Sequence, residues 1–529
     1  MPQPPNPSTD TQAQKPGALL GVRAQVFQNI GSDHAHLTTE ALCHDVIMPS
    51  TVTEKCSFSS LLARRDSEGA TAMVAPATCF VSHAWKYRFS DVVDCVQQYE
   101  ALHPNTYFWF DLFANNQHEA TAYQFEWWCS TFRDSIQSIG SVLLVMAPWH
   151  NPLPLTRAWC LWEIFSAIQA SAQLSIIIPL SQREDFKARV SADREVVLRC
   201  VMAVDARQAQ ALKATDRENI FHAISSTVGF DVLNTRVRDG LRDGYLRACV
   251  AIAEDERVRG PADARTGLLF NQLGGILAAF GQPDAAIACF EKALAVYLAA
   301  GGPQQLDAAG TESNLGSAYR ARGDYDAAIA HHSRALTTRV ALLGENHPET
   351  ATSYNNIGIA YQAKGDPTQA RDCHSRALAI CLAVLGEPHP DTASSLSNLG
   401  VTLLSLGDFE QAIGLHTRAL SIRTATLGPQ HPLTANCHSN LGQAYTARGD
   451  SASAVEHHAH ALAALMAAMG THANTARAHH SLGLAQQAAG DLAQARHHFA
   501  AAAHMAASVL PAGHSQRLVY ESSLTQCPI

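Results

Sequence analysis

The chain has 529 residues, 47% of them hydrophobic and 16% charged, a composition typical of a globular protein with roughly two to four domains. Its net charge of −9 disfavours nucleic acid as a partner, because phosphate binding requires basic surface. The 13 cysteines include no Cys-x-x-Cys pair, which favours reduced thiols in a cytoplasmic protein over a disulfide framework.

The first segment, residues 1–37, begins with a stretch rich in proline, glutamine, serine and threonine, and we predict a disordered N-terminal tail. It has neither the basic start nor the apolar centre of a signal peptide. The most apolar run of the chain, 141–149, is too short to cross a bilayer. We therefore expect no membrane association.

Residues 38–181 alternate short apolar runs with amphipathic stretches, which predicts an α/β domain with a doubly wound parallel sheet. The predicted strands begin at Cys79, Tyr107, Val142 and Leu174. His83 and Asp111 fall at the ends of the first two strands. Since ligands bind at the carboxyl ends of strands in such sheets, both are candidate substrate-binding residues.

Three motifs of this domain resemble a Toll-receptor-like (TIR) domain: Phe80-Val81-Ser82, Phe110-Asp111 and the run Trp-Cys-Leu-Trp-Glu-Ile at 159–164. The resemblance implies self-association through the TIR-like domain. In TIR domains that cleave NAD, the glutamate of the third motif is catalytic, so the resemblance places that role on Glu163. NAD is then a substrate, and no cofactor and no metal are expected.

Helical geometry is compatible with this role. Glu163 points roughly 200° away from the core residue Leu161, and Trp159 lies one turn below it on the same side. A carboxylate beside an indole can hold ribose hydroxyls while the ring covers the nicotinamide, which adds Trp159 to the candidate substrate-binding residues. The alternative is an exposed first-turn glutamate favoured by the helix dipole, with Trp159 merely packed. The resemblance also implies a basic residue near the first strand, for which Lys86 is the only close candidate.

Residues 182–257 are predicted to form a mainly helical connector. The chain contains no Gly-x-x-x-x-Gly-Lys-Ser/Thr motif, so a P-loop ATP switch between the two halves is not expected.

Residues 258–515 are predicted to form six helical hairpins, before a C-terminal tail at 516–529. Glycines recur at 274, 316, 358, 400, 442 and 483, a nearly constant interval of roughly 42 positions. A fixed period of this size is typical of stacked hairpins, each of which buries its apolar face against its neighbours.

The recurring pattern has Leu-Gly-x-x-Tyr in the first helix, a glycine after that helix, and a ring side chain between two alanines in the second helix. This pattern resembles the tetratricopeptide repeat, whose usual period is shorter, at roughly 34 residues. The recurring Leu-Gly-x-x-His-Pro at 343–348, 385–390 and 427–432 resembles the long repeats of kinesin light chains. Both resemblances imply an all-α tetratricopeptide superhelix that binds a protein or peptide in its groove.

Four asparagines recur at the same interval as the glycines, directly before the packed leucine or isoleucine of each first helix: Asn314, Asn356, Asn398 and Asn440. Amides on the concave surface could hold the backbone of an extended peptide, which makes them candidate partner-binding residues. The alternative is that each amide bonds to the neighbouring repeat and locks the stack. Arg334, Arg376 and Arg418 form a second series, which is explained better by a solvated face than by an acidic peptide.

Histidines occupy the ring position of four repeats, at His332, His374, His416 and His458. Phenylalanine takes the same position in the first and last repeats, at Phe290 and Phe499. Packing therefore explains these histidines better than metal binding does.

Two functional hypotheses remain open. In the first, the array binds a polypeptide and the TIR-like domain acts as an assembly module or as an NAD-cleaving effector in signalling. In the second, the protein is a non-catalytic cargo adaptor or scaffold of kinesin-light-chain type. Such a light chain needs a coiled coil, and no sustained heptad pattern precedes the repeats, which favours the first hypothesis.

Overall fold

The computed structural model describes the chain except for residues 1–18, 66–71, 120–124, 152, 212, 259–263, 301, 303–304, 471, 510–512 and 528–529. The chain divides into two compact units, an N-terminal unit at Met1–Gly281 and a repeat unit at Gln282–Ile529. The described residues include no helix that is both long and apolar enough to cross a membrane.

The N-terminal unit contains a six-stranded mixed sheet in the order β2-β1-β4-β3-β5-β6. Four consecutive strands, from β4 to the edge strand β6, are parallel, as predicted: β4 (Phe108–Phe110), β3 (Cys79–Ser82), β5 (Ser141–Val145) and β6 (Gln173–Ile177). The other two strands were not predicted. β1 (Leu20–Val22) pairs antiparallel with both β2 (Val74–Pro76) and β4.

The predicted disorder of residues 1–37 is wrong for its second half. Residues 20–34 supply β1 and the helix α1 (Ala24–His34). The physical reason is Phe27, which is fully buried with its ring 5.3 Å from Phe110 and 5.1 Å from Phe113. Residues 1–18 lie outside the described part of the chain.

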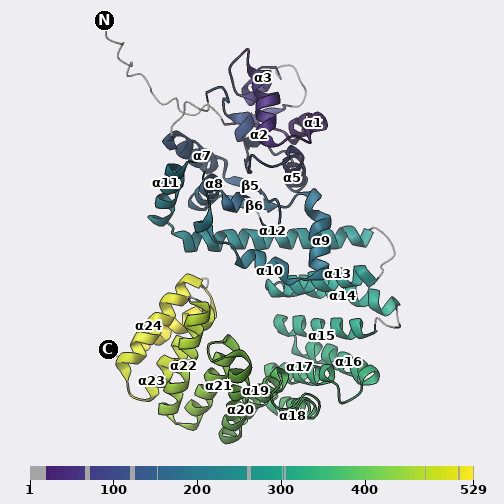
Figure 1. The fold of residues 1–529 in the computed structure, drawn as a ribbon, viewed down its shortest axis with the longest axis vertical. Helices are drawn as coiled ribbons and strands as arrows, with labels where there is room; N and C mark the ends of the chain where they lie inside the picture. The colour runs from purple at the N-terminus through teal and green to yellow at the C-terminus, as the bar shows by residue number, and fades with distance from the viewer. Residues whose placement is uncertain are drawn as a thin grey trace. The chain divides into compact units, whose positions relative to one another are not determined.

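Helices cover both faces of the sheet, as expected of a doubly wound fold (Figure 1). On one face, α1 and α5 (Phe89–Leu102) enclose the main hydrophobic core. On the other face lie α7 (Phe125–Ile139), α8 (Ala158–Gln169) and α12 (Phe230–Val258). The smaller helical segments of the same unit are α2 (Thr39–Leu42), α3 (Met48–Thr51), α4 (Phe58–Arg65) and α6 (Asp111–Ala114).

The segment at 182–257 contains the helices α9 (Arg183–Ala192), α10 (Glu195–Met202) and α11 (Ala214–Ser225) and most of α12. It packs against the sheet and forms part of the same unit. Two glycines allow this close approach: a Cβ at Gly240 or Gly244 would lie 3.0 or 3.1 Å from the side chain of Ile176 on β6. The unit ends with α13 (Ala264–Ala279), so the boundary at Gly281 divides the first predicted repeat.

The repeat unit stacks helical hairpins in sequence order (Figure 1). The helices are α14 (Pro283–Ala300), α15 (Gln305–Arg322), α16 (Tyr325–Leu343), α17 (Pro348–Lys364), α18 (Pro367–Val384), α19 (Pro390–Ser405), α20 (Phe409–Leu427), α21 (Pro432–Arg448), α22 (Ser451–Met469), α23 (Ala473–Ala488), α24 (Leu492–Val509) and α25 (Ser515–Gln526). Residues 516–529 were expected to be a tail, but α25 packs on α24, because it buries Tyr520 against Ala502 and Ala506.

The packing prediction for the glycines and histidines is confirmed. His416 is fully buried, and a Cβ at Gly400 would lie 2.6 Å from its ring. The same contact recurs between Gly358 and His374, and Phe499 replaces the histidine opposite Gly483. Glycine therefore sets the distance between the two helices of a hairpin.

We predict that Gly400→Ala destabilises the repeat unit by about 1–3 kcal/mol, because the new methyl group overpacks a filled contact. The matched control is Gly414→Ala on α20. Gly414 is exposed, and a Cβ there would meet nothing within 4 Å, so alanine should stabilise the helix by about 0.5–1 kcal/mol. Urea unfolding followed by circular dichroism compares the two. Equal effects of both substitutions would contradict the packing explanation.

Candidate functional site

A polar cavity of about 490 Å³ lies in the N-terminal unit, beside the carboxyl ends of β3 and β4. Its lining includes all four candidate catalytic and substrate-binding residues of this domain: His83, Asp111, Trp159 and Glu163. The remaining lining residues are Trp85, Asn115, Gln117, Phe125, Trp128, Phe132, Arg157, Cys160, Lys213, Thr215 and Asp216.

Glu163 is the acid at the inner side of this cavity. It lies in the second turn of α8 and is only 8% exposed, so the alternative of an exposed first-turn glutamate is wrong. Burial raises the pKa of its carboxyl to about 8, against the opposing effect of the Ser82 hydroxyl, which donates a hydrogen bond to it. The site thus holds a carboxyl group that changes charge near neutral pH.

His83 and Asp111 lie side by side, as the strand-end argument predicted, with the imidazole Nδ1 3.7 Å from a carboxylate oxygen. The same carboxylate accepts hydrogen bonds from the Trp85 indole at 3.0 Å and the Leu112 amide at 2.8 Å, which fix its orientation. Burial lowers the pKa of His83 despite the attraction of Asp111, so its imidazole is neutral at pH 7.

Two buried polar atoms in the cavity lining have no hydrogen-bond partner among the described residues. They are Nε2 of His83 and the side-chain nitrogen of Asn115. A buried polar group without a partner costs free energy, so such groups in a cavity indicate positions where a polar ligand binds.

Aromatic rings form one wall. Trp159 lies 5.3 Å from Phe125 and 6.1 Å from Phe132 between ring centroids, and Trp128 lies 5.6 Å from Phe132. The Trp159 indole donates a hydrogen bond of 3.3 Å to Asp216 of α11, which holds the ring in place. This wall gives a planar ligand a stacking surface.

Two cationic residues of the cavity, Arg157 and Lys213, were missed by sequence reasoning. Arg157 lies two residues before Trp159, the first residue of the third motif, so that motif could have indicated it, whereas Lys213 comes from the connector and had no local signal. Lys86, the candidate for a basic residue near the first strand, is exposed and is not among the residues that line the cavity. His118, which follows β4 and α6, lies 3.0 Å from the Thr51 hydroxyl and is not among the lining residues.

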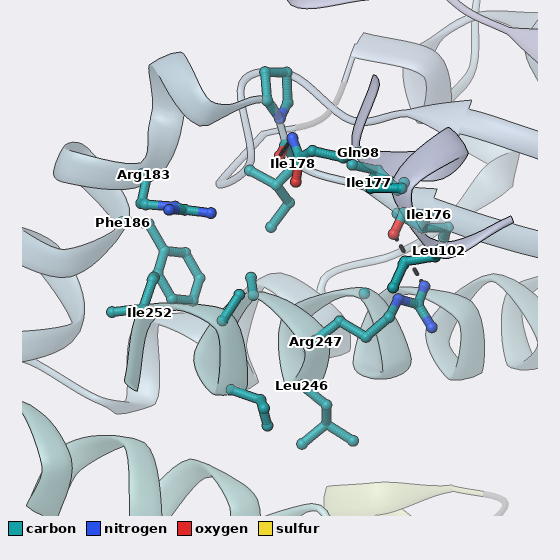
Figure 2. A pocket seen from close by; sticks show the side chains of 16 residues that line it. Gln98, Leu102, Ile176, Ile177, Ile178, Arg183, Phe186, Leu246, Arg247 and Ile252 are labelled. Carbon is teal, nitrogen blue, oxygen red and sulfur yellow. Dashed lines mark hydrogen bonds between the residues drawn. The ribbon is translucent and has the colours of Figure 1, made fainter. Parts of the chain in front are cut away.

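A larger hollow of about 660 Å³ lies between β6, α5, α9 and α12, and its lining is mostly apolar (Figure 2). The guanidinium of Arg247 donates to the carbonyl of Ile176 at 3.0 Å, and Arg183 pairs with Asp255 at 3.4 Å. Among the described residues that line it there is no carboxylate, histidine or cysteine. It therefore lacks groups for acid–base or nucleophilic chemistry.

In the repeat unit, the four asparagines are all half-buried, neither fully exposed nor sealed. They lie on α15, α17, α19 and α21, and each of these helices contacts the next of the series. Asn356 donates to the Ser313 hydroxyl of the preceding repeat at 3.1 Å, as the locking alternative expects. Within the described part of the chain, the amides of Asn398 and Asn440 have no such bond.

The arginine series is occupied by contacts within the unit, in line with a surface role. Arg334 pairs with Glu312 at 3.0 Å and Arg418 with Glu387 at 2.8 Å. Arg376 lies over the ring of Tyr354, 5.7 Å from its centroid. The described residues include no cluster of three or more side chains suited to hold a metal ion.

Comparison with known families identifies the repeats. Tetratricopeptide-repeat models match residues 272–341, 307–383, 355–425 and 391–467. No curated protein sequence matches the chain. The C-terminal half therefore contains tetratricopeptide repeats, which typically bind protein partners.

Several solved structures are similar to parts of the chain. BtubC (BKLC) from P. vanneervenii is 24% identical, with 43% of this chain and 91% of that chain covered and a TM-score of 0.39. A putative kinesin light chain from Podosopora anserina is 22% identical, with 39% and 98% covered and a TM-score of 0.36. A STAND protein with a tetratricopeptide sensor from Pyrococcus horikoshii is 16% identical, with 63% and 48% covered and a TM-score of 0.41.

Proposed function

We propose that the N-terminal unit is a TIR-like module that hydrolyses NAD, and that the repeat array binds a polypeptide partner. The observation that supports cleavage is the position of Glu163. It is a buried acid whose pKa is raised to about 8, in a cavity with an aromatic wall, two cations and two unpartnered polar atoms. Aromatic, cationic and hydrogen-bonding groups match the base, phosphate and ribose groups of a nucleotide.

In the proposed reaction, the bond between C1′ of the ribose and the nicotinamide nitrogen breaks, and nicotinamide leaves with the electron pair. The positive charge that develops on the ribose is stabilised by the Glu163 carboxylate. Water then adds at C1′ and releases one proton, which gives ADP-ribose. The neutral His83 and the amide of Asn115 would bind ribose hydroxyls, and Trp159 would cover the nicotinamide.

Incubation of the full chain with NAD, followed by chromatographic separation, tests this reaction. We expect nicotinamide and ADP-ribose in equal amounts. Glu126→Gln is a suitable control, since Glu126 is an exposed glutamate on the neighbouring α7 and is absent from the cavity lining. A control variant as inactive as a Glu163 variant would contradict a specific role for Glu163.

For the array, we propose that Asn398 and Asn440 hydrogen-bond to the backbone of an extended peptide. Their half-buried amides have no partner among the described residues, whereas the amide of Asn356 is already bonded to Ser313. Two amides at equivalent positions of successive repeats can hold one peptide at two points. This function does not depend on catalysis, so a scaffold role would retain it.

The test uses a peptide selected by display against the full chain. We predict that the double substitution Asn398→Ala and Asn440→Ala lowers the affinity for this peptide about tenfold, the effect of roughly two lost hydrogen bonds. Asn346→Ala, at an exposed amide between α16 and α17, should leave the affinity unchanged. Calorimetric titration measures both. Unchanged affinity in the double variant would remove the asparagines from the binding surface.

A further inference from the structure

The connector is attached to the cavity by main-chain hydrogen bonds on both sides of Arg157. The Gln210 amide donates to the Thr156 carbonyl at 2.8 Å, and the Ala158 amide donates to the Gln210 carbonyl at 2.8 Å. Arg217 donates from Nε to the Ala209 carbonyl at 2.8 Å, which ties the first turn of α11 to the same segment. Because residues 209–210 are fixed in this way, the start of α11 has a defined position beside α8.

Three connector residues therefore line the cavity: Lys213, Thr215 and Asp216. Lys213 is the residue before the first turn of α11, a helix of 12 residues whose N-terminal amides favour an anion. The Asp216 carboxylate accepts the hydrogen bond of the Trp159 indole at 3.3 Å. The connector thus adds a cation to the cavity and also orients its aromatic wall.

Arg157 supplies a second cation from the start of α8, where it is half-buried. The carboxylates in the lining already have partners: Asp111 faces His83 and Trp85, Asp216 faces Trp159, and Glu163 bonds to Ser82. The charge of Arg157 lowers the pKa of Glu163 and of His83, but among the described residues no carboxylate forms a direct ion pair with Arg157 or Lys213. Their charges are therefore available to a ligand.

We infer that Lys213 and Arg157 form a clamp for the diphosphate of a dinucleotide, so that the connector completes the substrate site. The unpartnered Nε2 of His83, with its side chain only 2% exposed, and the unpartnered amide of Asn115, 8% exposed, independently indicate a polar ligand in the same cavity. A diphosphate carries two negative charges, which two cations and a helix N-terminus can balance. This inference rests on the proposed function, because it assigns the substrate class of the same site.

Calorimetric binding of ADP-ribose and of adenosine to the full chain tests the clamp without catalysis. We expect ADP-ribose to bind at least about tenfold more tightly than adenosine, because only ADP-ribose carries the diphosphate. Lys213→Ala should reduce the affinity for ADP-ribose about tenfold and leave adenosine unchanged, and Lys213→Arg should restore it. Lys86→Ala, at an exposed lysine outside the cavity lining, is the matched control.

Equal affinities for the two ligands, or a Lys213→Ala variant with the affinity of the unmodified chain, would overturn the clamp. If NAD were still cleaved in that case, the proposed function would stand without it. Conversely, Lys213-dependent binding of ADP-ribose in a chain that releases no nicotinamide would support the clamp and refute hydrolysis.

Discussion

The repeat unit should unfold in mild acid, and His416→Phe should make it more resistant. Burial lowers the pKa of His332, His374, His416 and His458 to about 4. In the unfolded chain a histidine has a pKa of about 6.5 and binds a proton more readily. Each histidine therefore favours the folded state above pH 6.5, and this contribution is lost as the pH falls toward 4.

At pH 5 this linkage destabilises the fold by roughly 2 kcal/mol per histidine relative to pH 8, a large fraction of the stability of a domain. His416 has both ring nitrogens unpartnered among the described residues, so phenylalanine removes the proton-binding site without removing a bond. Phenylalanine already occupies the equivalent position in the last repeat, where Phe499 packs against Gly483. We expect His416→Phe to gain roughly 2 kcal/mol at pH 5 and much less at pH 8.

The two units can be observed separately. All 7 tryptophans lie between residues 85 and 162, in the N-terminal unit, so loss of helical circular dichroism without a change in tryptophan fluorescence reports the repeat unit. His504→Phe, at an exposed histidine of α24, is the control and should not alter the pH dependence. A His416→Phe variant with the acid sensitivity of the unmodified chain would show that the buried histidines do not cause it.

Glu163→Gln should lower the rate of NAD cleavage by about 10³-fold or more, because a neutral amide cannot stabilise the positive ribose. The value of kcat/KM for the unmodified chain should rise with pH and level off above about 8, where the free carboxyl is ionised. Kinetics of nicotinamide release between pH 6 and 9 measure both effects. A flat profile would exclude ionisation of Glu163 as the controlling step.

Glu163→Gln should raise the stability of the N-terminal unit at high pH although it lowers activity. A loss of activity in this variant is therefore not explained by unfolding. The folded-state pKa of about 8 lies above that of an ordinary glutamate, so Glu163 favours folding at low pH, and this contribution is lost as the pH rises toward 8. Glu163→Gln removes the ionisation. Followed by tryptophan fluorescence at pH 9, the N-terminal unit of the variant should be more stable than that of the unmodified chain.

The sequence predicted the repeats well because each hairpin reuses one contact, such as Gly400 against His416, and repetition makes that contact visible without a structure. The parallel strands were equally visible, since four of the five residues of β5 form a continuous apolar run after Ser141. β1 and α1 were missed because residues 20–34 follow a polar segment and are ordered by long-range contacts, namely the pairing of β1 with β2 and β4 and the packing of Phe27 against Phe89, Phe110 and Phe113. Such long-range contacts are not evident from the local composition of the sequence.

The candidate site was predicted in part for the same reason. His83, Asp111, Trp159 and Glu163 stand at strand ends or in a recognisable motif, and they do line one cavity. The buried Glu163 accepts a hydrogen bond from Ser82, which is 81 residues away, and Lys213 reaches the cavity from a different segment. Neither fact follows from helical periodicity, which places a side chain relative to its own helix and not relative to the rest of the fold.

The most direct test of the central claim is nicotinamide release from NAD by the purified full chain at pH 8, with Glu163→Gln measured beside it. The proposed site predicts that the unmodified chain produces nicotinamide and an equal amount of ADP-ribose, and that the variant produces almost none. Release by neither protein, or at the same rate by both, would contradict a catalytic role for Glu163.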